Sequence, residues 1–308
     1  MKRQRQVEEM DITQTAKKAV NKQCVKQTVP NRGQVRVGRA TYKGNKRIDP
    51  SYPGFTPIIC LTKSSEYGEI SPYCLTDKHG RILENVWHAS KCMPWVPQVK
   101  QRASRFNPTV IWEHPCEQHI GADGKITEKY RIWRKKLSNN KVPVRYPFGF
   151  SGRHNPNQFA LVEDAKTGEI LQDRKLDYVT ARKEIYFPLY LESVKNHPMF
   201  LNLKKRLDAG SDLLVVEIDG PHQESLEYYM EKYKVPKNWI ENSTMLVTKE
   251  SLKIMIEDTK HPAGHCLALA MALLGLSVAD IEAPPAELVS IPSFSSSSSS
   301  SNSVERDE

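Results

Sequence analysis

An acid, an aromatic ring, an imidazole and an amine occur at helical intervals in one short stretch of the chain. Residues 84–91 read ENVWHASK, and a helix that begins near Glu84 advances about 100° per residue. The side chains that then share one narrow face are Glu84, Trp87, His88 and Lys91. Such a stripe holds a carboxylate and an amine within reach of the same bond, with the indole as a stacking wall for a sugar or nucleotide. The same spacing also fits a surface charge pair beside a partly buried tryptophan.

The positive charge of the chain is concentrated in its first fifty residues. The 308 residues carry a net charge of +9, with 45 Lys or Arg against 36 acids. Residues 1–50 hold 13 of the basic residues and 4 of the acids, so the rest of the chain holds 32 of each. Because this segment is nearly free of aromatic residues, we expect a flexible basic arm that contacts nucleic acid or acts as a solubilising tail.

The composition predicts one domain between two tails. With 39% hydrophobic residues, the chain has enough apolar surface for one sizeable core, expected over residues 51–282. A proline pair and a serine run follow, so residues 283–308 are expected to be disordered. Six scattered cysteines without a CxxC pair, and no apolar segment of bilayer length, indicate an intracellular protein of the reducing cytoplasm or nucleus, without a membrane partner.

Helical and strand patterns alternate irregularly in the body of the chain. This mixture predicts a helix-rich α+β domain with short strands. Residues 213–218, LLVVEI, are typical of a buried strand, and residues 58–61 of another. Residues 77–80 have hairpin-turn chemistry, because Gly80 readily takes a positive φ. The segments expected to be helical are 177–190, 198–207, 225–232, 251–257 and 264–274.

The order of three motifs resembles the NADAR family. That family opens with a loop of the type L-S-N-F/Y, an Asp-Gly turn and a helix E-H-x-Y/F-Q-A-x-K, and residues 70–91 keep its Glu, aromatic, Ala and Lys at the same intervals. Residues 195–200 and 207–217 are similar to two later segments of the family. The chain departs from the pattern at Asn85 and His88, where His and Gln are usual. The resemblance covers residues 55–276 and implies the NADAR fold.

The resemblance implies a hydrolase of N-glycosidic bonds, because members of this family release ribose from a base-like nitrogen, including ADP-ribose on guanine in nucleic acid. Such a reaction builds positive charge on the ribose and negative charge on the leaving base. Glu84 would stabilise the cation or activate water. Lys91 would bind phosphate, protonate the leaving group or attack C1′ as an amine. Tyr73 and Trp87 would form stacking walls, and His88 would join them in substrate binding.

Two later positions are further candidates. Asp219 follows the expected buried strand, where a polar group is readily held in a cleft, and is the third candidate catalytic residue. A turn aspartate that caps a helix near Ser225 explains it equally well. Gly264 begins the last apolar helix and would let a substrate phosphate approach backbone amides, although a helix-start glycine has the same pattern without a ligand.

No metal ion or cofactor is expected. The close histidine groups at residues 114–119 and 261–265 lack a matched second pair of ligands. Residues 112–153 interleave basic side chains with Trp112 and Trp133, which fits a surface for single-stranded nucleic acid and also a charged face over buried tryptophans. The alternative to an ADP-ribosyl or ribosylamine hydrolase is therefore a non-enzymatic nucleic-acid-binding or virion-associated protein that uses the basic arm.

Overall fold

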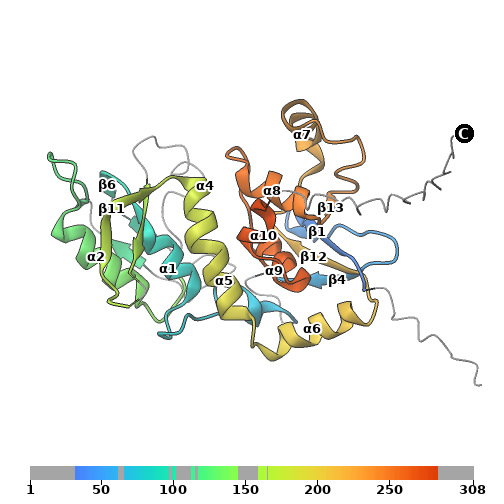
Figure 1. Cartoon of the computed structure of the whole chain (residues 1–308), viewed down its shortest axis with the longest axis horizontal. Helices are drawn as coiled ribbons and strands as arrows, with labels where there is room; N and C mark the ends of the chain where they lie inside the picture. Colours follow the sequence, from blue (N-terminus) through green and yellow to red (C-terminus); the bar gives the residue numbers. More distant parts are fainter. Residues whose placement is uncertain are drawn as a thin grey trace, which may run out of the picture.

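The protein mixes helices and short strands, in a manner compatible with the expected α+β class. The structure, a computed structural model, describes residues 32–61, 66–96, 99–101, 112–114, 117–144, 159–164 and 166–283. A four-stranded and a three-stranded sheet lie at opposite ends of the described part, with helices between them (Figure 1). None of the described helices is long and apolar enough to cross a membrane.

The four-stranded sheet has the order β13-β1-β12-β4. Its strands are β1 (Val35–Arg39), β4 (Thr56–Ile59), β12 (Leu213–Glu217) and β13 (Thr244–Leu246). Strand β12 runs parallel to both of its neighbours, β1 and β4, whereas β13 is antiparallel to β1. All five residues of β12 are buried, as its continuous apolar run predicts for a strand covered on both faces.

Strand β1 shows that the prediction of a flexible arm reaching residue 50 is wrong. Four successive residues, Val35 to Gly38, are buried inside the sheet. Arg36 is accommodated because its guanidinium carbon lies 3.6 Å from the centre of the Tyr52 ring and its Nη2 lies 3.8 Å from Glu241. The sheet therefore begins well before residue 51, while residues 1–31 and the expected tail at 284–308 lie outside the described residues.

Helix α9 (His265–Leu274) forms the centre of the larger core. It packs against β1 and β12 on one side and against α5 (Phe187–Val194) and α6 (Pro198–Asp208) on the other. Every side chain from His265 to Leu273 is buried, which confirms the apolar helix predicted at its position. The helix ends at Gly275, whose φ of +70° is the left-handed conformation that glycine adopts at helix C-termini.

The smaller core lies between helices α1 (Leu83–Ser90) and α2 (Glu128–Ser138) and a sheet of order β11-β10-β5. These strands are β5 (Lys91–Cys92), β10 (Phe159–Glu163) and β11 (Ile170–Leu176). Trp133 is buried in this core, which supports the charged-face interpretation at that tryptophan; the Trp112 side chain lies outside the described residues. The Tyr130 hydroxyl donates to the Ala89 carbonyl oxygen at 3.2 Å and so ties α2 to α1.

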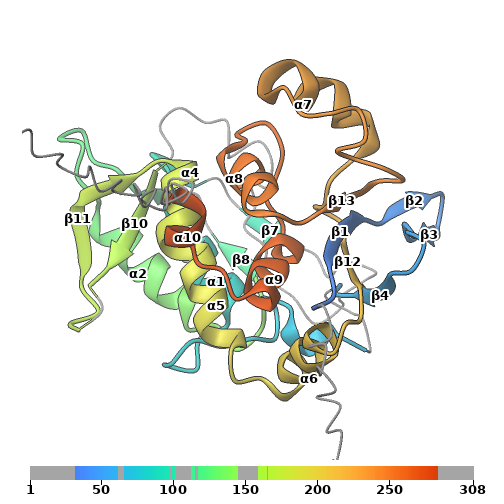
Figure 2. The same cartoon turned by 45° about the vertical axis from the view of Figure 1, so that its right-hand side comes forward.

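A continuous helical segment contributes Ala181, Phe187 and Tyr190 to the larger core on the side that faces α1. It comprises α4 (Tyr178–Ala181), the wider π-helical turn η2 (Arg182–Tyr186) and α5, and it runs between α1 and α9 (Figures 1 and 2). The other helices are α7 (Leu226–Tyr233), α8 (Lys249–Glu257), α10 (Val278–Glu282), η1 (Gly68–Ile70) and η3 (Gln223–Ser225). The remaining strands are β2 (Thr41–Lys43), β3 (Lys46–Ile48), β6 (Trp95–Val96), β7 (Val99–Gln101), β8 (Trp112–His114) and β9 (Glu117–Gln118).

Candidate functional site

Helix α1 holds three of the predicted side chains, Glu84, Trp87 and His88, and the fourth, Lys91, follows directly after it. Its first turn is anchored by two backbone N–H groups: Leu83 donates to Leu75 O at 2.9 Å and Glu84 donates to Pro72 O at 3.0 Å. The helix ends at Ser90 because Lys91 takes an extended conformation and starts β5. The helix predicted from residue 84 is therefore confirmed, within one residue at each end.

The predicted face forms a chain of contacts. His88 Nε2 donates to Glu84 Oε1 at 2.7 Å, and Lys91 Nζ lies 3.4 Å from His88 Nδ1. Because a carboxylate only accepts, Nε2 carries the hydrogen of the first contact, and Nδ1 faces the ammonium of Lys91. Lys91 Nζ also lies 4.6 Å from the centre of the Trp87 ring. The imidazole thus connects an acid to an amine. We call Glu84, Trp87, His88 and Lys91 the Glu84 cluster.

Glu84 is largely shielded from water and yet held in its ionised form. Its side chain is 12% exposed and that of His88 13%. Burial alone would raise the pKa of Glu84, but the charge and hydrogen bond of His88 outweigh it, with smaller contributions from Lys91 and His265, and the pKa lies below its ordinary value. The carboxylate is therefore a negative charge with little water around it, which strengthens its effect on a nearby cation.

The π-helical turn η2 supplies an aromatic residue to this cluster. Tyr186 lies at the end of η2, with its ring centre 5.2 Å from that of Trp87. Burial raises the pKa of Tyr186 well above its usual value, and the carboxylates of Glu84 and Glu217 raise it further. Tyr186 is thus a protonated phenol in the field of two acids. Single π-helical turns are frequent at functional sites, because the extra residue redirects a side chain.

Glu217 and His265 form a buried ion pair that the sequence analysis did not identify. Glu217 Oε1 lies 3.2 Å from His265 Nδ1, and His265 Nε2 donates to the Cys60 carbonyl oxygen. Both acceptors lack a proton to give, so both ring nitrogens carry hydrogen and the ring is an imidazolium. Burial opposes this charge, but Glu217 outweighs it and raises the pKa of His265 well above its usual value. The sequence contained two signals for this pair: an acid at the end of an apolar strand and a histidine at the start of an apolar helix.

Gly264 has a different role from the predicted one. A Cβ at this position would lie 2.0 Å from Glu217 Oε2, and Cys266 N donates to that oxygen at 3.5 Å. The start of α9 therefore receives the carboxylate of Glu217 where the sequence suggested a substrate phosphate. Glycine is required here because any side chain would collide with that acid.

Asp219 and Tyr73 lie at the periphery of the cluster. Asp219 is exposed, and its Cβ is 2.9 Å from where a Cβ on Gly264 would lie. The side chain that accepts at the following helix start is His222, from Glu224 N at 3.1 Å. Tyr73 is half-buried in the loop beside the first turn of α1 and does not line the hollow next to Trp87. The other aromatic side chains that line it are Tyr178 and Phe159, and the pairing of Tyr73 with Trp87 around a substrate stays a prediction.

The space beside the predicted residues is small. A hollow of about 20 Å³ lies between Trp87, Lys91, Phe159 and Tyr178, with Ala160, Leu176 and Ala181 completing its wall. That volume accommodates a single water molecule. Binding of a ribose would therefore require the side chains that line it to move.

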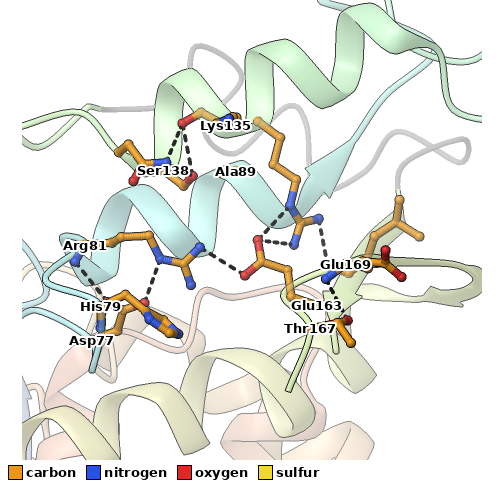
Figure 3. Close-up of polar contacts among 12 residues, drawn as sticks. Asp77, His79, Arg81, Ala89, Lys135, Ser138, Glu163, Thr167 and Glu169 are labelled. Atoms are coloured by element: carbon orange, nitrogen blue, oxygen red, sulfur yellow. Dashed lines mark hydrogen bonds and ion pairs between the residues drawn. The ribbon is translucent and has the colours of Figure 1, made fainter. Parts of the chain in front are cut away.

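Two large cavities lie on the side of α1 opposite to Glu84, and another of about 610 Å³ lies beside η1 and the start of α6. One of about 700 Å³ is bordered by Val86 and Ser90, and an adjoining one of about 550 Å³ by α2; both include Arg81, Arg134 and Glu163. We call this region the groove. Figure 3 shows Arg81 between Asp77 and Glu163, with its Nε 2.8 Å from Asp77 Oδ2 and its Nη1 3.0 Å from Glu163 Oε2. Arg134 Nη2 lies 3.2 Å from Glu163 Oε1, so both guanidinium groups are paired with acids.

Asn85 explains one departure from the NADAR pattern. Its Nδ2 donates to Asn140 O at 3.1 Å and to Val142 O at 2.9 Å, and its Oδ1 accepts from Val144 N at 2.7 Å. The residue is fully buried and fastens the segment after α2 to α1. An imidazole, with one donor in its neutral form, would satisfy fewer of these backbone groups.

No group of three metal-ligating side chains occurs among the described residues, which include His261 and His265 but not the side chains of His114 and Cys116. Comparison with models of known protein families, with curated proteins and with solved structures found no match to this chain.

Proposed function

We propose that the Glu84 cluster hydrolyses an N-glycosidic bond of an ADP-ribosyl or ribosylamine substrate, including ADP-ribose carried on a nucleic-acid base. The proposal is supported by the resemblance of residues 70–91 to the NADAR opening motif and by the contacts of that face of α1. The observation that carries it is the largely shielded, ionised carboxylate of Glu84, joined through His88 to the ammonium of Lys91.

Each residue has a role in this reaction. When the bond between C1′ and nitrogen breaks, its electron pair leaves with the base and the ribose ring becomes cationic. Glu84 offsets that positive charge and accepts a proton from the attacking water. Lys91 gives a proton to the leaving nitrogen, and His88 holds the acid and the amine in place because its two ring nitrogens contact both. After the products leave, Glu84 releases its proton to water and Lys91 regains one from water.

Lys91 acts here as a charged proton donor. Its ammonium lies over the face of Trp87, an arrangement that favours the cation, and it faces the charge of Glu84. Of the three roles that the sequence suggests, attack by the neutral amine is the least compatible with these surroundings. Asp219 is exposed and contributes at most to substrate approach.

The test is release of ribose or ADP-ribose from ADP-ribosylated DNA, free ADP-ribose and a ribosylamine nucleotide. We expect Glu84→Gln to lower kcat by about 10²–10⁴-fold, because the amide neither offsets the cation nor accepts a proton. Glu231→Gln changes an exposed acid on α7 and is the matched control, expected to have native turnover. Native turnover by Glu84→Gln, or none by the unaltered protein on any substrate, contradicts the proposal.

Nucleic-acid binding is the second candidate, and the hairpin of β2 and β3 favours it. Lys43 and Lys46 pair across this exposed hairpin, and Tyr42 beside them is 43% exposed. Two amines and an accessible ring suit a phosphate backbone with an adjacent base. Changing both lysines to Gln should reduce the slope of log K against log salt by about 1.4 for single strands. An unchanged slope would remove the hairpin from any nucleic-acid contact.

A further inference from the structure

A histidine and an aspartate three residues apart form one line of hydrogen bonds with a serine from a more distant part of the chain. Ser225 Oγ lies 3.0 Å from His261 Nε2, and His261 Nδ1 lies 2.7 Å from Asp258 Oδ2. Because the carboxylate only accepts, Nδ1 carries the hydrogen of the neutral ring, so Nε2 accepts from the Ser225 hydroxyl. A nucleophile, a base and a group that orients the base thus have the required order and distances.

Asp258 is held rigidly in this arrangement. The residue has 0% exposed surface, and its two oxygens accept from the hydroxyls of Tyr228 at 2.7 Å and Tyr229 at 2.9 Å, and from Lys260 N at 3.0 Å. The backbone on either side is fastened by Arg182, which donates to Asp258 O at 2.7 Å and to His261 O at 3.0 Å. The imidazole therefore keeps one orientation.

Ser225 is placed as a nucleophile rather than as a helix cap. It is the N-cap residue of α7, a position where a serine side chain commonly accepts from the N–H groups of the first turn. Here the side chain makes no such bond and is directed to His261 instead. The N–H of Leu226, the first residue of α7, donates to Gln223 O, so it is satisfied without the hydroxyl of Ser225.

Both reacting groups are reachable from solvent. The side chain of His261 is 23% exposed, and Ser225 is half-buried. Neither residue lines the groove or the hollow beside Trp87, so the proposal is directed at small acyl groups.

We propose that Ser225, His261 and Asp258 form a second catalytic site, which hydrolyses small carboxylic esters through an acyl-serine. Ser225 Oγ bonds to the ester carbonyl carbon while its proton passes to His261 Nε2. The carbon–oxygen bond of the ester then breaks, and the leaving alcohol takes that proton. Water next attacks the acyl-serine, its proton passes to His261 and then to Ser225 Oγ, and the carboxylic acid is released. Asp258 acts as a positioning residue through Nδ1.

The experiment combines hydrolysis of p-nitrophenyl acetate with modification by a fluorophosphonate probe, followed by peptide mass mapping. We expect the probe on the peptide that contains residue 225, and none there in Ser225→Ala. His261→Gln keeps the nucleophile but lacks the base, so labelling should slow by about 10²–10⁴-fold. Ser193→Ala is the matched control, because it removes a buried hydroxyl that has no hydrogen-bond partner, and it should react like the unaltered protein.

The outcomes separate this site from the Glu84 cluster. Ser225→Ala should keep native N-glycosidase turnover, and Glu84→Gln should keep native labelling of Ser225. Urea unfolding midpoints show whether each variant is folded. Absence of an adduct in the unaltered protein, an adduct that persists in Ser225→Ala, or equal rates for folded His261→Gln and the unaltered protein would overturn the proposal.

Discussion

The two faces of helix α1 differ in their ionisable groups and in the free volume beside them. The face with Glu84 and Lys91 holds interacting ionisable groups beside a hollow of about 20 Å³. The face with Val86 and Ser90 borders the groove, which offers about 700 Å³ in one of its cavities. Chemistry and space therefore lie on opposite sides of one helix.

This difference shows that volume alone does not locate reactivity. In the groove, Glu163 accepts from two guanidinium groups and the charges cancel pairwise at a partly exposed surface. In the Glu84 cluster, the acid is kept ionised away from water, and a second pair, Glu217 and His265, adds charge nearby. Low dielectric surroundings make such charges act strongly on a bound cation, whereas in the groove each guanidinium is already neutralised by a directly bonded acid.

The largest effect on this comparison is expected from Glu217→Gln. Removing one partner leaves the His265 imidazolium buried and uncompensated, so the free energy of unfolding should fall by about 3–5 kcal/mol. Urea unfolding measures it, with Glu224→Gln, whose side chain is 89% exposed, as the control. If the free energy of unfolding falls no further than in Glu224→Gln, then Glu217 and His265 do not form a stabilising ion pair.

A smaller effect is expected in the groove from Glu163→Gln. The amide has one acceptor oxygen for two guanidinium groups, so unfolding should become easier by about 1–3 kcal/mol. Turnover of the ADP-ribosyl substrates should stay native, because the reacting groups lie on the other face of α1. A large loss of turnover with retained stability would indicate that the reaction takes place in the groove.

The smallest effect is expected in the pH dependence of His88→Gln. The pKa of Glu84 lies below its ordinary value, chiefly because His88 outweighs burial. The fall of kcat toward low pH, which we call the acid limb, should therefore occur below the pH at which an ordinary carboxyl group is protonated. A lowered pKa stabilises the fold above the unfolded pKa of Glu84, and this contribution is lost as the pH falls through the folded pKa. In His88→Gln the acid limb should move to higher pH. If the acid limb of His88→Gln does not move, the titrating group is not Glu84.

Much of the regular structure could be predicted from local patterns. The expected helices at residues 198–207 and 251–257 correspond to α6 and α8, and the buried strand at 213–218 to β12. Strand β1 was missed because the basic residues around Val35 and Val37 dominate the composition of that segment. Its pairing with β12, 178 positions away at Val35 and Leu213, is a long-range contact that composition does not encode.

The sequence by itself determined that Glu84, Trp87, His88 and Lys91 share a face, because helical geometry fixes neighbours three and four residues apart. Only the tertiary structure decided what that face meets. The approach of His265 to Glu84, the use of Gly264 by Glu217 and the location of the groove all depend on how distant segments pack. Backbone periodicity is local, whereas burial, charge compensation and free volume arise only when separate elements are brought together.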